Sequence, residues 1–516
     1  MSGEGIIYDF AEPGETASTF TVAKQYSNEA IRVEIANADV TMPLYDILNG
    51  GIVKDGPGAA AFLMPDRNVR LSVANATPWK GNKNGDAGFV IRQGEVAFRG
   101  RTPTVRELTY SWANFKLGVE DPIEAARVAP PRLVFDHVKF SASATGIGFG
   151  KVADGPSAGD ASFFATNHAD VSINGFVSGL NKTGTPSKES AYVKIDDHST
   201  VSGLYASYVY GDGCEKLVFD IDHESVLALN SFDTRGNIEM NFRNGSVLKF
   251  QPRSGGGLHA LAITYGVATH LTKFRFESGS KCYVNKIGEQ QADKTSLKSD
   301  CRMLFDDGEW NPLKDAFTFC FERITGELAV KGAGLVLAPT NTQVWTVGTP
   351  IVDSAEGAGG LVKRGEGTVI LNAENLKYTG VTRLEGGVLD LDGSAVENLT
   401  VESVGGAFAN GTLVKPTYRV AVDDDWQAAT PAVIDPSLVS GRVTIDLGRT
   451  EANPLPLPYR SLAVATYTGD VAPDVSKWRA TGTGIPNTKV ALAVDPPTKT
   501  ITATADQRDG FFIFLQ

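Results

Sequence analysis

Three of the six histidines occupy the same place in a repeated polar turn. His168, His198 and His223 each lie three residues before a valine, and Asp197 and Asp222 directly precede two of them. If the segments that carry these turns stack, the imidazoles form a column at a spacing of about 5 Å. Such a column binds a transition metal or acts as a pH-sensitive patch, with the carboxylates orienting the rings. The alternative, which we favour from sequence alone, is that Asn, Asp and His simply suit exposed turns.

A second set of residues offers acid–base chemistry on neighbouring segments of the chain. Two carboxylates at a suitable separation serve as acid and base in glycosidic cleavage. A Lys or Arg instead removes a proton beside a uronate, while acidic side chains bind calcium. Because outward positions of any soluble β-sheet are polar, we assign no catalytic residue and retain six candidates, Lys194, Asp196, Asp220, Asp222, Glu239 and Arg243. The chain has no His-Glu-x-x-His or phosphate-loop motif.

Trp310 is the best single candidate for a ligand contact. It lies beside Asp306, Asp307 and Glu309, so an aromatic face and several acceptors are close in sequence. The competing interpretation is that Trp310 packs in the core.

The four cysteines are Cys214, Cys282, Cys301 and Cys320. An even number suggests disulfides formed in an oxidising compartment, with three possible pairings. Free buried thiols are the alternative. The chain has no Cys-x-x-Cys motif, so the cysteine spacing does not indicate a zinc or redox site.

The composition excludes some classes of partner. The formal net charge is −12 and charged residues make up 21% of the 516 residues. We therefore expect no nucleic-acid partner, since phosphate binding requires a basic face. No stretch approaches the ~20 apolar residues of a transmembrane helix, and the start lacks a signal peptide, so a leader for secretion would be absent from this chain. We expect no cofactor.

The secondary-structure pattern is one of short strands and tight turns. Runs of four to six alternating residues end at Asn, Asp, Gly or Ser, and the turns align on Val40, Val171, Val201, Val226 and Val247. The last four valines are 30, 25 and 21 residues apart. These distances match the coils of a parallel β-helix, whereas the turns of a β-sandwich, the alternative, usually recur every ~8–12 residues. The sequence therefore predicts an all-β parallel β-helix.

One stretch carries a family resemblance. Residues 357–391 read GAGGLVKRGEGTVILNAENLKYTGVTRLEGGVLDL. This stretch resembles the autotransporter-associated β-strand repeat, which is found in the passenger regions of bacterial secreted and surface proteins. The resemblance implies a right-handed parallel β-helix. The chain departs from the repeat in one turn, where Leu376 and Lys377 replace one residue and Val381 replaces a second Gly.

The residue types of this repeat fit such a coil. Val369, Leu371, Leu389 and Leu391 are spaced two apart and are expected to point inward. The glycines at 365, 367, 386 and 387 permit the positive φ values of sharp corners.

The domain prediction follows the coil rhythm. We expect an irregular N-terminal cap with the first irregular coils over residues 1–125 and a β-helix over 126–297. Residues 298–323 form a cysteine-containing surface insertion, with Cys301–Cys320 as a possible clip. A β-helix with the autotransporter-type repeat spans 324–450, and a C-terminal β segment or cap spans 451–516.

These observations predict a secreted or cell-surface β-solenoid of a bacterium that acts as a structural stalk, an adhesin-like module or an extracellular assembly component. Its partner would be a cell-surface or matrix component, a glycan or a second copy joined through apolar ends such as FFIFL (511–515). The alternative is a carbohydrate-active β-helix, either a polysaccharide lyase or a glycoside hydrolase, or a glycan-binding protein. Because no catalytic set is concentrated in the chain, we expect a protein that is not an enzyme.

Overall fold

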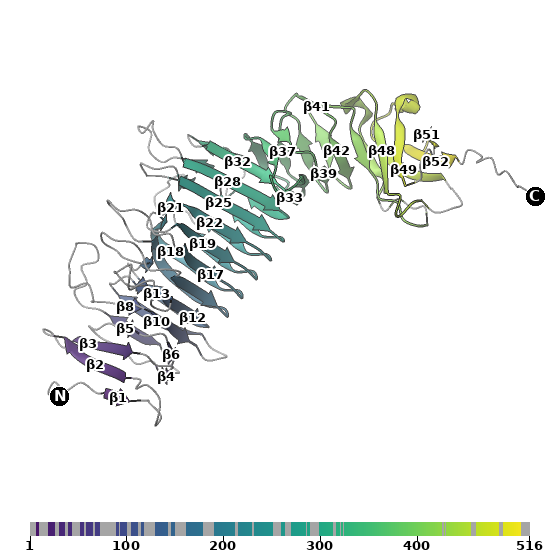
Figure 1. Ribbon diagram of the computed structural model, residues 1–516. Coiled ribbons are helices and arrows are strands. Elements are labelled where there is room, and N and C mark those ends of the chain that lie inside the picture. The colour runs from purple at the N-terminus through teal and green to yellow at the C-terminus, as the bar shows by residue number, and fades with distance from the viewer. Residues whose placement is uncertain are drawn as a thin grey trace, which may run out of the picture. The chain divides into compact units, whose positions relative to one another are not determined.

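A computed structural model gives the fold of the chain (Figure 1). It describes residues 7–9, 19–25, 30–36, 40–43, 52–55, 58–64, 68–72, 89–91, 93–100, 105–111, 115–117, 130–142, 146–149, 161–178, 190–211, 215–229, 232–250, 260–263, 270–284, 286–288, 299–312, 316–319, 321–322, 325–425, 428, 430–455, 461–484 and 489–506. The chain divides into two compact units. Unit 1 holds Met1–Met303 and Phe321–Gly326, and unit 2 holds Leu304–Cys320 and Glu327–Gln516.

Unit 1 is a parallel β-helix in which successive coils add one strand to each of three series. The first series is β4 (Val40–Pro43), β6 (Ala59–Leu63), β9 (Glu95–Arg99), β12 (Arg132–Asp136), β15 (Ser162–Thr166), β17 (Ser190–Ile195), β19 (Lys216–Ile221), β22 (Ile238–Phe242) and β25 (His270–Glu277). All neighbours in it pair in parallel. Figure 1 shows β17, β19, β22 and β25 side by side.

The second and third series complete each coil of unit 1. The second is β7 (Val69–Ser72), β10 (Arg106–Ser111), β13 (Val138–Ala142), β16 (Asp170–Ser178), β18 (Thr200–Gly211), β20 (Val226–Leu229), β23 (Val247–Phe250) and β26 (Lys281–Tyr283). The third is β3 (Ala30–Ala36), β5 (Ile52–Asp55), β8 (Phe89–Ile91), β11 (Phe115–Leu117), β14 (Gly146–Phe149), the distal parts of β16 and β18, β21 (Phe232–Gly236), β24 (Ala260–Ile263), β27 (Lys286–Gly288) and β31 (Phe321–Glu322).

The N-terminal antiparallel part is shorter than the cap predicted for 1–125. Among the described residues of 1–125, antiparallel pairing is confined to β1 (Ile7–Asp9), β2 (Thr19–Gln25) and β3. Parallel pairing already begins at β3–β5 and β4–β6. The sequence between these strands is irregular, but the short alternating runs are enough for each strand to join a coil, because the neighbouring strand supplies its hydrogen bonds.

Phenylalanine rings stack along the interior of unit 1. The rings of Phe62 and Phe98 lie 5.4 Å apart, and those of Phe98 and Phe135 lie 5.5 Å apart. The ring of Phe163 follows at 5.9 Å from that of Phe135. Because each ring belongs to a successive strand of the first series, the coils bury the same kind of side chain against one another.

Unit 2 is a second set of stacked parallel strands. One series is β29 (Gly308–Asn311), β33 (Gly332–Leu337), β36 (Gly359–Lys363), β39 (Val381–Leu384), β42 (Thr400–Ser403), β45 (Thr417–Arg419), β48 (Thr444–Arg449) and β50 (Arg479–Thr483). A second is β30 (Ala316–Phe319), β34 (Val344–Val347), β37 (Thr368–Ile370), β40 (Val388–Asp390) and β43 (Ala407–Ala409).

Shorter series close the coils of unit 2. They are β32 (Thr325–Val330), β35 (Ile351–Asp353) and β38 (Leu376–Lys377), and β41 (Ala395–Glu397), β44 (Thr412–Val414) and β47 (Val439–Ser440). At the C-terminal end, β46 (Ala432–Ile434) pairs in parallel with β49 (Ser461–Tyr467), while β52 (Thr500–Asp506) runs antiparallel to β49 and to β51 (Lys489–Asp495). These antiparallel strands fall within the predicted C-terminal segment 451–516. Residues 511–515 lie outside the described residues.

The prediction of an all-β parallel β-helix is confirmed. The described residues form strands and turns, together with two short 3-10 helices, η1 (Pro436–Leu438) and η2 (Val475–Lys477). Within the part of the chain that the structure describes, no helix has the length and apolarity needed to cross a membrane.

The repeat at 357–391 forms coils as expected. Val369, Leu371, Leu389 and Leu391 are fully buried, so the predicted inward positions are confirmed. Gly365 and Gly387 have φ values of 73° and 62°. Gly367 and Gly386 do not have positive φ. Gly367 is needed for a different reason, because a Cβ there would collide with the carbonyl oxygen of Thr340.

The surface insertion predicted at 298–323 is wrong. The segment forms β28 (Ser299–Asp306), β29, β30 and β31, and these strands take regular places in the coils; β29 pairs with β33, and β30 with β34. The acidic residues of this segment suggest a surface loop. In β28, however, every second residue is buried, namely Cys301, Met303 and Phe305, which is the pattern of a half-buried strand.

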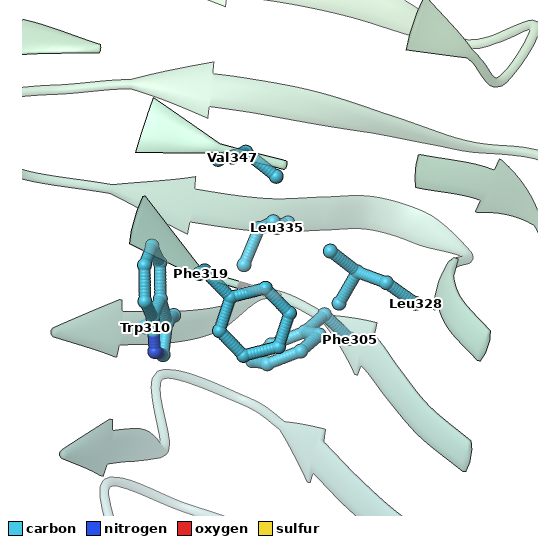
Figure 2. A pocket seen from close by; sticks show the side chains of 6 residues that line it. All are labelled: Phe305, Trp310, Phe319, Leu328, Leu335 and Val347. Atoms are coloured by element: carbon cyan, nitrogen blue, oxygen red, sulfur yellow. The ribbon is translucent and has the colours of Figure 1, made fainter. Parts of the chain in front are cut away.

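Trp310 is buried in an apolar cluster of unit 2, so its assignment as a ligand contact is wrong. Figure 2 shows the six side chains of this cluster: Phe305, Trp310, Phe319, Leu328, Leu335 and Val347. The rings of Trp310 and Phe319 lie 4.8 Å apart in an edge-on arrangement. The cluster has no space for a water molecule, so it serves as packing rather than as a binding pocket.

Candidate functional site

The candidate site lies on the corner between the first and second strand series of unit 1. Five two-residue turns stack there, at 167–168, 197–198, 223–224, 244–245 and 278–279, and we call them the turn series. Both residues of each turn have positive φ. Asn and Asp tolerate this conformation and Gly adopts it freely, which explains much of the composition of these turns.

Backbone hydrogen bonds fix the register of the turn series. The amide of His168 donates to the carbonyl of Asp197, and that of His198 donates to the carbonyl of His223, both at 2.9 Å. The amide of Glu224 donates in the same way to Asn244. His198 and Glu224 are therefore equivalent second residues of their turns, and His223 is a first residue.

This register corrects the predicted histidine column. The alignment on valines placed His223 with His168 and His198, but Val226 pairs with Thr200 and not with Val201. His223 is therefore displaced by one position, and Glu224 takes the third place in the column. Only two of the three predicted imidazoles stack.

His168, Asp197 and His198 come together at the surface. The rings of His168 and His198 are stacked with centroids 5.1 Å apart and planes tilted by 27°. One potential ligand atom from each of the three residues lies within 4.8 Å of the other two. The Nδ1 atom of His198 is 3.2 Å from Oδ1 of Asp197, and its Nε2 atom is 3.6 Å from Oε2 of Glu224. The arrangement thus offers two imidazoles and two carboxylates on one exposed edge.

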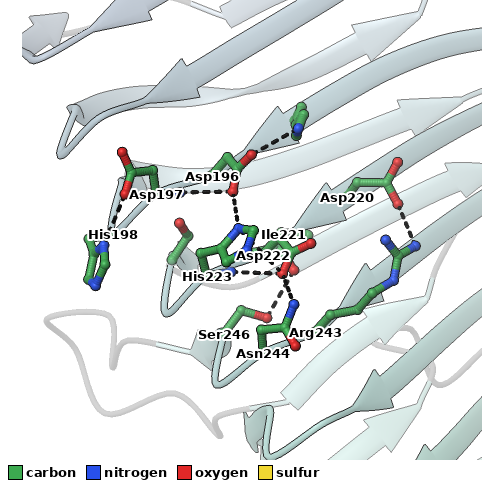
Figure 3. A network of polar contacts seen from close by, with 12 residues as sticks. Asp196, Asp197, His198, Asp220, Ile221, Asp222, His223, Arg243, Asn244 and Ser246 are labelled. Carbon is green, nitrogen blue, oxygen red and sulfur yellow. Dashed lines mark hydrogen bonds and ion pairs between the residues drawn. The ribbon is translucent and has the colours of Figure 1, made fainter.

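His223 belongs to a separate contact. Its Nδ1 lies 2.7 Å from Oδ1 of Asp196 on the preceding coil, as Figure 3 shows. This hydrogen bond raises the pKa of His223, with further support from the charge of Asp222. Burial alone would raise the pKa of Asp196, but the hydrogen bonds from Lys194 and His223 outweigh it and hold that pKa below its usual value.

The six acid–base candidates lie on β17, β19, β22 and the turns after them, and each is engaged with a neighbour. Arg243 Nη2 donates to Oδ1 of Asp220 at 3.2 Å, and Lys194 Nζ lies 2.8 Å from Asp196. Figure 3 shows the first of these bonds and the contact between Asn244 and Asp222, which measures 2.7 Å.

The remaining candidate, Glu239, is held as an anion. Lys216 on the preceding coil donates to its carboxylate at 2.9 Å. Burial would raise the pKa of Glu239, but the hydrogen bond and charge of Lys216 outweigh it and lower the pKa. A general acid requires a carboxyl pKa raised toward neutrality. Asp196 and Glu239 are both shifted in the opposite direction, which suits a structural role.

The two cysteines that the structure describes provide no site. Cys282 and Cys301 are buried free thiols, so the clip between Cys301 and Cys320 is not formed. Burial raises the pKa of both thiols. Cys214 and Cys320 lie outside the described residues.

Unit 2 has an open polar hollow that sequence reasoning missed. Its volume is about 460 Å³, and Glu402, Arg419, Asp446 and Arg449 line it. Arg419 lies 3.4 Å from Asp446. The buried Arg449 donates from Nη2 to Asp424 at 2.7 Å, while its Nε has no hydrogen-bond partner among the described residues. The four lining residues come from the neighbouring strands β42, β45 and β48 and lie up to 47 positions apart in the sequence, so only the coil register brings them together.

Sequence reasoning also missed the residues that complete the turn series. Glu224 directly follows His223, and Lys216 and Asn244 bind the candidate carboxylates. The buried serines at 199, 225 and 246 follow the turns at the same position, so an alignment on them places Glu224 in the turn series.

No family model matches the chain, and no similar protein is found among curated sequences or solved structures.

Proposed function

We propose that the protein is an extracellular or cell-surface structural scaffold, a β-solenoid that presents its outer faces to a partner. One observation carries this proposal. Carboxylates retained from the sequence as candidates for acid–base chemistry instead join coils: Asp220 pairs with Arg243, Glu239 with Lys216, and Asp196 with His223. Such contacts align neighbouring strands and leave no free acid–base pair among these residues.

The surface location rests on the repeat at 357–391. Its resemblance to the autotransporter-associated repeat favours a secreted or surface-attached protein of a bacterium. Each coil of a solenoid contacts only its neighbouring coils, so stacking extends the chain in one direction, which suits a stalk, an adhesin-like module or an assembly component.

Labelling of intact cells tests this location. Antibodies raised against the purified chain are expected to bind intact cells of the producing bacterium, and brief external protease treatment is expected to remove the signal. A cytoplasmic protein serves as the control for lysis. Labelling that appears only after permeabilisation contradicts the proposal.

A second assay separates scaffold from enzyme. Incubation with neutral and acidic polysaccharides is expected to give no new reducing ends and no unsaturated products. Turnover of any polysaccharide that is lost in Asp220→Asn or Glu239→Gln would establish the carbohydrate-active alternative instead.

Glycan binding is a second candidate, favoured by the polar hollow of unit 2. Its volume suits one or two sugar rings, and Arg419 and Asp446 supply donors and acceptors. Binding to immobilised glycans that is weakened at least tenfold by Arg419→Gln supports this function. Arg364→Gln is the matched control, because Arg364 pairs with Glu385 and does not line the hollow. Equal loss in both variants, or no binding, contradicts it.

A further inference from the structure

We propose that His168, Asp197 and His198, with Glu224 beside them, form a surface site for a divalent transition-metal ion such as Zn²⁺ or Ni²⁺. The three residues first named supply two imidazole nitrogens and one carboxylate oxygen from adjacent coils. Glu224 supplies a second carboxylate from the next coil. A metal ion bound here would link neighbouring coils at this corner, since His168 and His198 are 30 residues apart in sequence.

The distances fit a metal ion after a small side-chain movement. Zinc binds nitrogen and oxygen at about 2.0–2.2 Å, so in a tetrahedral site two ligand atoms lie about 3.3–3.6 Å apart. The three ligand atoms here all lie within 4.8 Å of one another. His198 and Asp197 have exposed side chains, so rotation about their side-chain bonds brings the set together.

The turn conformation permits the two histidines but does not require them. The second residue of each turn has positive φ, with values of 58° at His168 and 60° at His198. Gly245 and Gly279 fill the same position in later coils and adopt it without steric cost. Histidine also tolerates this conformation, so the observation that supports a metal site is the convergence of the two imidazoles with the carboxylate of Asp197.

The donor set selects the class of ion. Imidazole nitrogens suit zinc, nickel and copper, whereas calcium and magnesium prefer sites made of oxygen ligands. The carboxylates of Asp197 and Glu224 add negative charge, which favours a divalent cation over an anion.

Calorimetry on the full chain without an appended histidine tag tests the site. Titration with ZnCl₂ and with NiCl₂ at pH 7.5 is expected to show binding at one ion per chain. MgCl₂ is expected to show none. His168→Gly and His198→Gly keep the backbone conformation found at Gly245 and Gly279, and each is expected to weaken binding at least tenfold.

His223→Asn is the matched control. Asn244 occupies the equivalent position one coil later, so this variant retains the fold, and its affinity for Zn²⁺ should stay within about twofold of the original. Far-ultraviolet circular dichroism checks that every variant is folded. Undetectable Zn²⁺ and Ni²⁺ binding, or binding that His168→Gly and His198→Gly leave unchanged, overturns the proposal.

A spectroscopic measurement identifies the ligands directly. Cu²⁺ bound to the chain is expected to show coupling to two imidazole nitrogens in electron paramagnetic resonance. His198→Gly is expected to reduce this to one. A spectrum that is the same in both proteins contradicts the assignment.

Discussion

The imidazole of His223 lies 2.7 Å from the carboxylate of Asp196 on the preceding coil, and this contact removes His223 from the column formed by His168 and His198. A displacement of one residue within the turn thus gives neighbouring histidines different partners. His223 becomes part of an ion pair that joins two coils, whereas the other two imidazoles face each other.

The first prediction concerns the pH dependence of this contact. The pKa of His223 is raised in the folded protein, so the folded state binds more protons than the unfolded state above pH 6.5. The stabilisation from His223 is therefore fully present below pH 6.5 and lost as the pH rises through the raised value. The difference in melting temperature between the original protein and His223→Asn should be larger at pH 6 than at pH 9.

Histidine-selective nuclear magnetic resonance checks the cause of this shift. In Asp196→Asn the pKa of His223 should move back toward 6.5, because its first hydrogen-bond partner loses its charge. Measurements in EDTA separate this effect from metal binding. An unchanged pKa would show that Asp196 is not responsible.

The second prediction concerns Lys363, which is buried inside the repeat coil. Its Nζ donates to the carbonyl oxygens of Gly365 at 2.7 Å, Gly386 at 2.9 Å and Arg364 at 3.0 Å. Lys363→Met leaves these acceptors without the ammonium and should lower the free energy of unfolding by about 2–3 kcal/mol. Urea denaturation at pH 7 measures this loss. Lys377→Met, which changes an exposed lysine, is the control.

The stabilising effect of Lys363 should also depend on pH. Burial lowers its pKa to about 8 from 10.5, so between these values the unfolded chain binds more protons than the folded chain. The contribution of Lys363 to stability should therefore rise with pH across this window. The difference between the original protein and Lys363→Met is expected to grow from pH 8 to pH 10, and a falling difference contradicts the shift.

The third prediction separates two reasons for glycine in unit 2. Gly360 lacks space, because a Cβ there would collide with the carbonyl oxygen of Val381. Gly393 has open space but a φ of 71°. Gly393→Ala should cost about 1–2 kcal/mol of unfolding free energy from its backbone conformation. Gly360→Ala should cost more, since the backbone of an adjacent coil must move, and the reverse order in urea denaturation would refute the explanation.

The fourth prediction concerns the buried thiols. Burial raises the pKa of Cys282 and Cys301, so little thiolate is present and access is blocked. N-ethylmaleimide should modify neither residue in the folded protein and both after denaturation, as mass spectrometry of peptides can measure. Modification of the folded protein at Cys301, or a disulfide-linked peptide containing Cys301, contradicts the structure.

The sequence predicts most of the coil architecture because local alternation determines it. Val369 and Leu389 are spaced correctly from their neighbours for burial, and both are buried. The contacts of the candidate site could not be predicted as well, because they depend on the register between coils. Valine does not mark the register between coils, since Val201 is buried whereas Val226, with which the sequence aligns it, is only partly buried.

Serine is the better marker of the register. Ser199, Ser225 and Ser246 are fully buried after the turns, and the backbone amide of Ser199 donates to the hydroxyl of Ser225 at 3.1 Å. Each thus faces the interior and bonds to an adjacent coil. An alignment on these serines places Glu224 after His198 in the column and reveals the displacement of His223.

The coils of unit 1 contain different numbers of residues although their turns stack in register. Paired residues are 30 positions apart at Val171 and Val201, 26 at Thr200 and Val226, and 21 at Val226 and Val247. Insertions and deletions in the connecting segments are therefore compatible with the fold, whereas a single deletion within a turn would shift every contact on that corner. The chain can vary in length between its coils while the spacing of its surface groups stays the same.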